Sequence, residues 1–443
     1  FLVSDPQSLS EQLLQTSGSA VSTVLATFGV SFLLMLVPAT LIGATFPVAG
    51  QICVRDRSRA ATGVGRAYAV NTLGNVLGAL APGLLLLAWL GIQKGIVAMA
   101  VLNVGVGLAV LTLRSILGGR RPAWRFALPL ALMAAIAVVS LVPLQFQFPS
   151  EGERDYHRTL FYREGPLATT KVYADPRSGE KYMSVDGIVI GGTGYTEFKQ
   201  LLLAHLPKLL AEDYSTELSV GVGSAILLGE SARHAGVREI TAVEIEPGVV
   251  EGAAWFEAEN HGVLADPRLR IVRDDIGSFL RTTRERYQVI SADEKTADEF
   301  ASNGFSYSKE YYDLLRQHLA PDGLVAQWVP STLPPSQYRM VLNTFLQSFP
   351  HVQLWYFMPS HRRGPFNTIL IGSNEPLDID PDRIDERLAS QPDAFSSLER
   401  YGLTSALAVL PHFITKDQAL RAAVAGARPN PNEVKVSHEP SNR

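Results

Sequence analysis

The sequence predicts an α/β protein in three parts: a transmembrane helix bundle, a small β-hairpin domain and a doubly wound sheet. Four long apolar segments fill the first third of the chain. Residues 159–192 then alternate between apolar and polar side chains over short stretches, as in the strands of hairpins. From Thr196 to Gly372, helical and strand patterns alternate, which is typical of a doubly wound sheet.

The composition indicates that part of the chain lies in a membrane. Hydrophobic residues make up 47% of the 443 residues, and the mean hydropathy is +0.11. The net charge is −4 and no basic tract is present, which argues against a nucleic-acid partner. The single cysteine, Cys53, excludes an internal disulfide and a multi-cysteine metal site.

The four apolar segments are predicted to be transmembrane helices. Each is close to the ~20 residues that cross a bilayer core, and they cover residues 24–48, 67–90, 95–113 and 126–142. Small residues inside them favour close helix packing, so residues 1–148 are expected to form a bundle in a lipid bilayer. Because the chain begins with Phe1 in a loop-like segment, we expect it to be the C-terminal part of a longer bundle.

The side of the membrane stays open. Arginines cluster between the first two spans and between the last two, and the positive-inside rule places both loops in the cytoplasm. Four spans then put the rest of the chain on the opposite side, unless one span is miscounted.

The rest of the chain is predicted to divide at three boundaries. A small β domain is expected over residues 155–197 and a doubly wound sheet domain over 198–373. The last two strands of that domain, at residues 351–357 and 366–372, are joined by a short loop and predict an antiparallel hairpin at the sheet edge. Residues 374–443 are expected to be a helical extension that ends in a disordered tail.

A glycine turn between strand and helix predicts a nucleotide-type pocket. Gly221 and Gly223 follow an apolar strand and precede Ser224 and a helix, so a ligand could approach the backbone and the helix N-terminus. A second strand delivers Glu244, whose carboxylate could accept both ribose hydroxyls. Because the third glycine of a dinucleotide fingerprint is absent, an adenosyl-sulfonium cofactor is favoured over NAD. The alternative is that the glycines only form a tight turn.

Two more strands end in acidic residues at the same edge of the sheet. Asp274 and Asp275 follow the strand at 269–272, and their alternative role is to cap the next helix. Asp293 follows the strand at 287–292, and it too could be a loop residue that caps a helix.

Six short motifs follow one another along the chain: VDG at 185–187, AHLP at 204–207, VGVGS at 220–224, VEIEP at 243–247, DPR at 266–268 and APDGL at 320–324. Taken in order, they resemble the spermidine synthases, specifically the bacterial branch in which a transmembrane region precedes a polyamine aminopropyltransferase domain. The resemblance implies a Rossmann-like, methyltransferase-type sheet and a location in the bacterial inner membrane. It also implies transferase activity, decarboxylated S-adenosylmethionine as co-substrate, and a homo-oligomer.

The resemblance also assigns roles to single residues. It places Gly221 and Gly223 against the cofactor, Glu244 on its ribose and Asp275 near the adenine amino group. In the resembled enzymes the residue at Asp293 takes a proton from the attacking amine, which must lose a proton to gain a lone pair.

The acceptor part departs from the family pattern. The second carboxylate expected three residues after Asp293 is missing, and Glu294 stands beside it instead. Lys199 replaces an expected tyrosine, and a fixed cation there would repel a dicationic diamine. Tyr307 belongs to a segment, 295–307, that could close over a ligand or simply pack. Lys199, Glu294 and Tyr307 are therefore weaker candidates for substrate binding.

We do not expect a metal site. The histidines lie on different elements without ligand spacing and are expected at the surface or at helix caps. The function predicted first is a membrane-anchored aminopropyltransferase acting on putrescine or another amine. The second is an S-adenosylmethionine-dependent methyltransferase, in which Lys199 could pair with the methionine carboxylate. The third is a non-catalytic transport or sensor protein that binds a polyamine or nucleoside.

Overall fold

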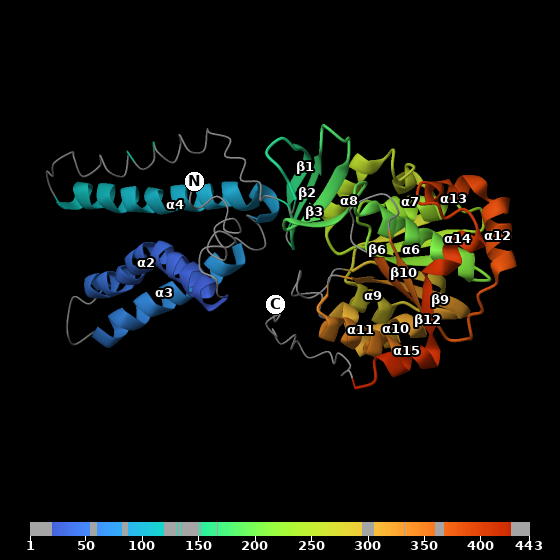
Figure 1. Ribbon diagram of the computed structural model, residues 1–443. Coiled ribbons are helices and arrows are strands. Elements are labelled where there is room, and N and C mark those ends of the chain that lie inside the picture. Colours follow the sequence, from blue (N-terminus) through green and yellow to red (C-terminus); the bar gives the residue numbers. More distant parts are fainter. Residues whose placement is uncertain are drawn as a thin grey trace. The chain divides into compact units, whose positions relative to one another are not determined.

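The computed structural model describes residues 20–53, 60–81, 87–118, 131, 134, 150, 152–165, 167–294, 305–331, 333–358 and 367–426. The chain divides into two compact units, residues 1–149 and 150–443 (Figure 1). The predicted boundaries at 155, 198 and 374 fall inside the second unit and stay predictions.

The described residues of the first unit form three long helices, α2 (Ala20–Cys53), α3 (Ala60–Ala81) and α4 (Leu87–Gly118). Large apolar side chains on all three are exposed, including Phe28, Leu73 and Leu102. One stretch of α2, Ser31–Gln51, is long and apolar enough to cross a membrane, and none of its most apolar window is buried. A signal sequence near an N-terminus would pass the same test, so length and composition do not distinguish the two.

The four predicted spans are not all found in the described residues. Within the predicted span 67–90, α3 covers the residues up to Ala81 and α4 those from Leu87, and residues 82–86 lie outside the described residues. Gly91 interrupts α4 with φ 72° and ψ 178°. Apart from residues 131 and 134, the predicted span 126–142 lies outside the described residues.

The second unit begins with a four-stranded antiparallel sheet. Its strands, in spatial and sequence order, are β1 (Arg158–Glu164), β2 (Thr169–Ala174), β3 (Lys181–Val185) and β4 (Ile188–Gly192). Asp186 and Gly187 connect β3 to β4 with φ values of 47° and 86°. Two consecutive residues with positive φ are typical of the tight turns of two-residue hairpins.

An eight-stranded mixed sheet follows, in the order β12-β10-β11-β9-β8-β5-β6-β7. Strands β9, β8, β5, β6 and β7 are parallel, whereas β11, β10 and β12 are joined by antiparallel pairing. The strands are β5 (Thr216–Val220), β6 (Glu239–Val243), β7 (Leu269–Val272), β8 (Tyr287–Ala292), β9 (Leu319–Pro330), β10 (His351–Phe357), β11 (Asn367–Ser373) and β12 (Phe413–Lys416).

Helices cover both faces of this sheet (Figure 1). Successive side chains of a strand point to opposite faces, so Val289 and Ile290 of β8 belong to two different hydrophobic cores. The first core contains the apolar face of α6 (Glu197–Leu210), and the second contains Tyr311, Tyr312 and Leu315 of α10 (Lys309–Gln317). The remaining helices are α7 (Ile226–Ala232), α8 (Pro247–Ala253), α9 (Ile276–Thr282), α11 (Pro335–Ser348), α12 (Pro381–Ser390), α13 (Pro392–Glu399), α14 (Ala406–Val409) and α15 (Asp417–Ala423).

The predicted antiparallel pair of β10 and β11 is present, but its predicted place at the sheet edge is wrong. Strand β12 pairs with β10 and forms the edge instead. The C-terminal region therefore contributes a strand as well as helices. The predicted disordered tail lies outside the described residues.

Three of the histidines are buried: His318 forms the C-cap of α10, in line with the predicted cap positions, whereas His205 and His234 lie in the interior. His205 Nδ1 lies 2.9 Å from His234 Nε2, and His205 Nε2 lies 2.9 Å from the Ser397 hydroxyl and 3.1 Å from Glu230. This polar cluster connects α6 and α7 to α13. Burial lowers the pKa of His205, since it disfavours the charged ring more than Glu230 favours it.

Candidate active site

A cavity of about 420 Å³ lies at the carboxyl ends of β5, β6, β7 and β8. The chain runs from β5 outward to β6 on one side and returns to β8 on the other. Ligands of doubly wound folds bind at such a reversal of strand order. The cavity thus lies where the acidic residues that follow these strands come together.

The glycine turn forms one wall of the cavity. Gly221 has φ +90° and Gly223 has φ +53°, a region of backbone conformation that side chains disfavour. The Val222 N–H points back toward β6 and donates to Glu244 Oε2 at 3.0 Å. The two glycines therefore allow the turn and add no side chain of their own to this wall.

Glu244 lines the cavity at the end of β6 and is held by backbone donors on two sides. Its Oε2 accepts from Val222 N–H, and its Oε1 accepts from Glu246 N–H at 2.9 Å. Burial raises the pKa of Glu244 above its usual range, and the backbone donors oppose that shift. The carboxyl group is thereby fixed beside the glycine turn.

Ser224 does not line the cavity, although the sequence predicts it as a cofactor contact. The side chain is fully buried, and its hydroxyl donates to Gln200 Oε1 at 2.6 Å. Gln200 belongs to α6 and itself lines the cavity, so Ser224 lies behind a lining residue. Its contribution is to connect the turn to that helix.

Asp274 and Asp275 both line the cavity, and both also hold local backbone. Asp275 caps α9, because its Oδ1 accepts from Ser278 N–H at 2.9 Å. Asp274 Oδ1 accepts from Asp275 N–H at 2.8 Å. The capping role and the pocket position proposed for Asp275 are thus compatible, because only one of its oxygens is used by the cap.

Two cavity carboxylates were missed at the level of sequence. Glu246 caps α8 through Gly248 N–H at 2.9 Å, and its other oxygen is buried without a hydrogen-bond partner among the described residues. Asp186 in the β3–β4 turn accepts from Thr169 N–H at 2.8 Å. Pro247 after Glu246, and Gly187 after Asp186, are the local signals that could have indicated a cap and a turn.

Asp293 lines the opposite end of the cavity, directly after β8, and is paired with Lys199. The Lys199 Nζ donates to Asp293 Oδ1 at 2.8 Å from the first turn of α6. The same ammonium lies 4.3 Å from the centre of the Trp328 ring on β9. Lys199 is buried and does not itself line the cavity.

Glu294 lies beside Asp293 and is held by side chains. The Tyr311 hydroxyl donates to Glu294 Oε1, and Gln327 Nε2 lies 3.4 Å from Oε2. The Tyr307 hydroxyl donates to the Glu294 carbonyl at 2.5 Å, so Tyr307 supports this residue without lining the cavity. Burial raises the pKa of Glu294 to about 7 despite the donors around it.

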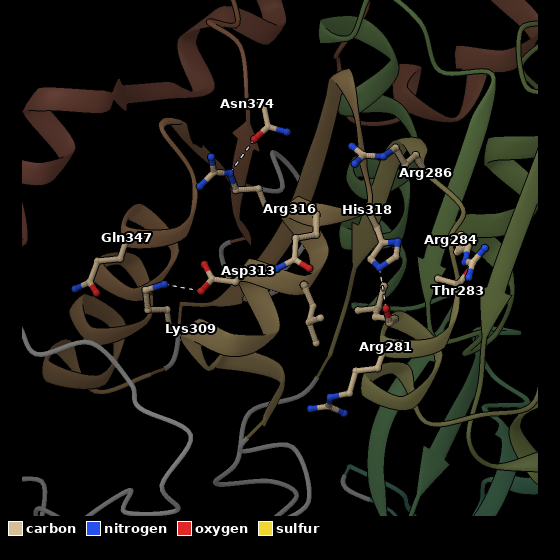
Figure 2. Close-up of a pocket in the computed structure, with 13 residues that line it drawn as sticks. Arg281, Thr283, Arg284, Arg286, Lys309, Asp313, Arg316, His318, Gln347 and Asn374 are labelled. Atoms are coloured by element: carbon tan, nitrogen blue, oxygen red, sulfur yellow. Dashed lines mark hydrogen bonds and ion pairs between the residues drawn. The ribbon is translucent and has the colours of Figure 1, made fainter.

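The charge of this cavity differs from that of the neighbouring hollow on the same unit. Seven carboxyl side chains line the cavity: Asp186, Glu244, Glu246, Asp274, Asp275, Asp293 and Glu294. Among the described residues, no lysine, arginine or histidine lines it. A second hollow, of about 970 Å³, is lined by basic side chains that Figure 2 shows around it: Arg281, Arg284, Arg286, Lys309 and Arg316. The acidic cavity is suited to cations, and the basic hollow is not.

No group of three or more potential metal ligands occurs within the described ranges. The carboxylates of the cavity are instead spread over the ends of separate strands.

Comparison with known proteins agrees with this architecture. Residues 196–376 match the model of the spermine/spermidine synthase domain. The chain is 30% identical over 313 residues to polyamine aminopropyltransferase 1 of Streptomyces coelicolor, covering 66% of this chain and 56% of that protein. It is 28% identical over 331 residues to the polyamine aminopropyltransferase of Mycobacterium tuberculosis, covering 68% and 59%. The chain thus spans less than two thirds of the length of these transferases.

A solved structure shows the same fold. It is a spermidine synthase in complex with the transition-state analogue AdoDATO, with a TM-score of 0.51 and 16% identity, covering 60% of this chain and 88% of that one. The mixed sheet, the family match and the similarity to polyamine aminopropyltransferases agree that residues 196–376 form a spermine/spermidine synthase domain.

Proposed function

We propose that this protein is a membrane-anchored aminopropyltransferase that transfers the aminopropyl group of decarboxylated S-adenosylmethionine to an amine. The observation that carries the proposal is the acidic cavity, with seven carboxyl groups and no basic side chain among the described lining residues. The co-substrate carries a sulfonium and an ammonium, and the acceptor is an ammonium at neutral pH. Carboxylates at close range stabilise all three charges.

The co-substrate is proposed to bind at the end of the cavity formed by β5, β6 and β7. Gly221 and Gly223 leave room for it beside the backbone, and Glu244 is oriented by two backbone donors so that it can accept the ribose hydroxyls. Asp275 is proposed to accept from the adenine amino group, with Asp274 next to it.

The reaction needs a base at the other end. The acceptor ammonium loses a proton to a carboxylate, and the freed lone pair attacks the carbon bonded to the sulfonium. The new C–N bond forms as the C–S bond breaks, and the sulfur leaves as a neutral thioether with the electron pair. Asp293 is the proposed base. Glu294 is the second candidate, because it lines the same cavity and its pKa of about 7 suits proton transfer near neutral pH.

The test is to incubate the full chain with decarboxylated S-adenosylmethionine and a panel of amines, and to detect aminopropylated products by mass spectrometry. Product formation that requires the co-substrate supports the proposal. Absence of product with every amine, together with absence of co-substrate binding by calorimetry, would favour a non-catalytic binding protein.

The Lys199–Asp293 ion pair argues against the methyltransferase alternative. A methyl donor keeps its methionine carboxylate, and Lys199 was the residue predicted to pair with it. The Lys199 ammonium is already bonded to Asp293 at 2.8 Å. Tighter binding of intact than of decarboxylated S-adenosylmethionine would reverse this preference.

The membrane anchor rests on the exposed apolar helices. Ser31–Gln51 of α2 has the length and composition of a span, and exposed apolar side chains continue along α3 and α4. A lipid bilayer, in bacteria the inner membrane, is the proposed location, and a homo-oligomer remains a prediction from the family resemblance. Retention of the chain in membranes washed with alkaline carbonate supports the anchor, and its release contradicts it.

A further inference from the structure

The acceptor end of the cavity contains an ammonium group that belongs to the protein. Lys199 is buried, its Nζ lies 2.8 Å from Asp293 Oδ1, and it lies 4.3 Å from the centre of the Trp328 ring. A carboxylate combined with an aromatic face is the arrangement by which proteins bind alkylammonium ligands. Here a lysine from α6 occupies that arrangement.

The ion pair changes the charge that remains for a substrate. Lys199 compensates the charge of Asp293. Glu294 is the other carboxyl group that follows β8 among the described residues, so the charge left for a substrate at this end depends on it. Burial raises the pKa of Glu294 to about 7, which leaves this group partly protonated at neutral pH. Asp293, Glu294 and Lys199 together therefore carry at most one negative charge.

Two of the other five cavity carboxylates are held at the opposite end by backbone donors. Glu244 is held by the N–H groups of Val222 and Glu246, and Asp275 by that of Ser278. These residues follow β6 and β7 on the side of the glycine turn. They serve the co-substrate in the function proposed above, so they do not supply a second countercharge to the acceptor.

We propose that Lys199 restricts the acceptor to amines with a single ammonium group, because its own ammonium places a like charge beside Asp293 and occupies the indole face that the second ammonium of a diamine would need. This inference rests on the proposed function for the identity of the reaction. The selection between amines is a property of binding, however, and can be measured without turnover.

The experiment compares two amines with the same carbon chain, butylamine and 1,4-diaminobutane. Calorimetry measures their binding to the full chain, with 5′-methylthioadenosine present in place of the co-substrate so that no transfer occurs. We expect the wild type to bind butylamine at least about tenfold more tightly, because a second ammonium beside Lys199 meets a like charge. In Lys199→Met the like charge is removed and the face of Trp328 can receive that ammonium, so the preference should reverse.

Two control variants separate selectivity from folding. Lys208→Met removes another buried lysine of α6, whose Nζ lies 2.8 Å from Glu217 and which does not line the cavity, and it should keep the wild-type ratio of affinities. Lys199→Arg keeps a cation next to Asp293 and should keep the preference for butylamine even if Lys199→Met fails to fold. Thermal unfolding of each variant identifies those that are folded.

The outcomes distinguish this inference from the proposed function. A wild type that prefers the diamine, a Lys199→Met variant with the wild-type ratio, or binding of neither amine would overturn the inference. Selective amine binding without an aminopropylated product from decarboxylated S-adenosylmethionine would instead remove the proposed function and leave the role of Lys199 intact.

Discussion

The two ends of the acidic cavity are held in place by different kinds of contact. At the glycine-turn end, backbone N–H groups of nearby residues orient Glu244 and Asp275. At the other end, side chains orient the carboxyl groups: Lys199, 94 residues earlier in the chain, holds Asp293, and Tyr311 and Gln327 hold Glu294. Substitutions can change the second end without changing the fold, so we expect specificity to vary there while the first end keeps its ligand.

Asp293→Asn should have the largest effect on turnover, and it should affect only the acceptor end of the cavity. We expect turnover to fall by about 10²- to 10⁴-fold, the usual loss when a general base is removed. Binding of decarboxylated S-adenosylmethionine, measured by calorimetry, should not change. Asp266→Asn removes a carboxylate that pairs with Arg268 and does not line the cavity, so its turnover should stay at the wild-type level. Unchanged turnover in Asp293→Asn would shift the role of base to Glu294.

Glu294→Gln should remove a pH dependence of stability that arises at the acceptor end. The pKa of Glu294 is about 7 in the folded protein and 4.5 as the ordinary value. Because the pKa is raised in the folded protein, the protonated Glu294 contributes its full stabilisation of the fold below pH 4.5. This contribution is lost as the pH rises through 7. The difference between the two pKa values corresponds to about 3 kcal/mol in the free energy of unfolding.

Urea unfolding of wild type and variant at several pH values across this window measures the effect. The free energy of unfolding of the wild type should decline relative to that of Glu294→Gln as the pH rises. Parallel curves for the two proteins would show that Glu294 is not buried as the structure indicates.

The parts of the site that were predictable from the sequence are those built by local contacts. Gly221, Gly223 and Glu244 lie on one strand-turn-helix-strand unit, whose spacing brings them to the same cavity. Ser224 is not among the residues that line the cavity, because its hydroxyl donates to Gln200, which belongs to another helix. The pairing of Lys199 with Asp293 could not be derived either, since nothing in the sequence relates α6 to the end of β8.

The same distinction applies to the fold. The antiparallel pair of β10 and β11 was predictable, because each strand has seven residues and a strongly apolar pattern. Strand β12 has only four residues, with half-buried and exposed side chains in alternation, and it pairs with β10 across a long stretch of sequence. So short an element carries too weak a periodic signal to be distinguished from a loop.

Glu244→Gln should weaken the glycine-turn end without affecting the choice of amine. A hydrogen bond to a charged group contributes about 1.5–3 kcal/mol, so co-substrate affinity should fall by about ten- to hundredfold. Calorimetry with decarboxylated S-adenosylmethionine measures this change. Glu239→Gln, at the exposed start of the same strand, is the matched control and should bind normally. A changed preference between butylamine and 1,4-diaminobutane in Glu244→Gln would contradict the separation of the two ends.

Gly221→Ala should have the smallest effect on binding and tests whether the turn contacts the co-substrate. A methyl group there would lie 3.9 Å from Glu244 Oε2, so the variant suffers little from clashes, and its cost comes from the backbone at φ +90°. Left-handed backbone costs a non-glycine residue about 1–2 kcal/mol. Gly179→Ala is the matched control, because Gly179 has φ +77° in the β2–β3 turn and nothing within 4 Å of an added methyl group. Both variants should lose similar stability in urea unfolding, but only Gly221→Ala should weaken co-substrate binding, since only its methyl group faces the cavity. Equal binding by both variants would mean that the glycine turn shapes the backbone without touching the ligand.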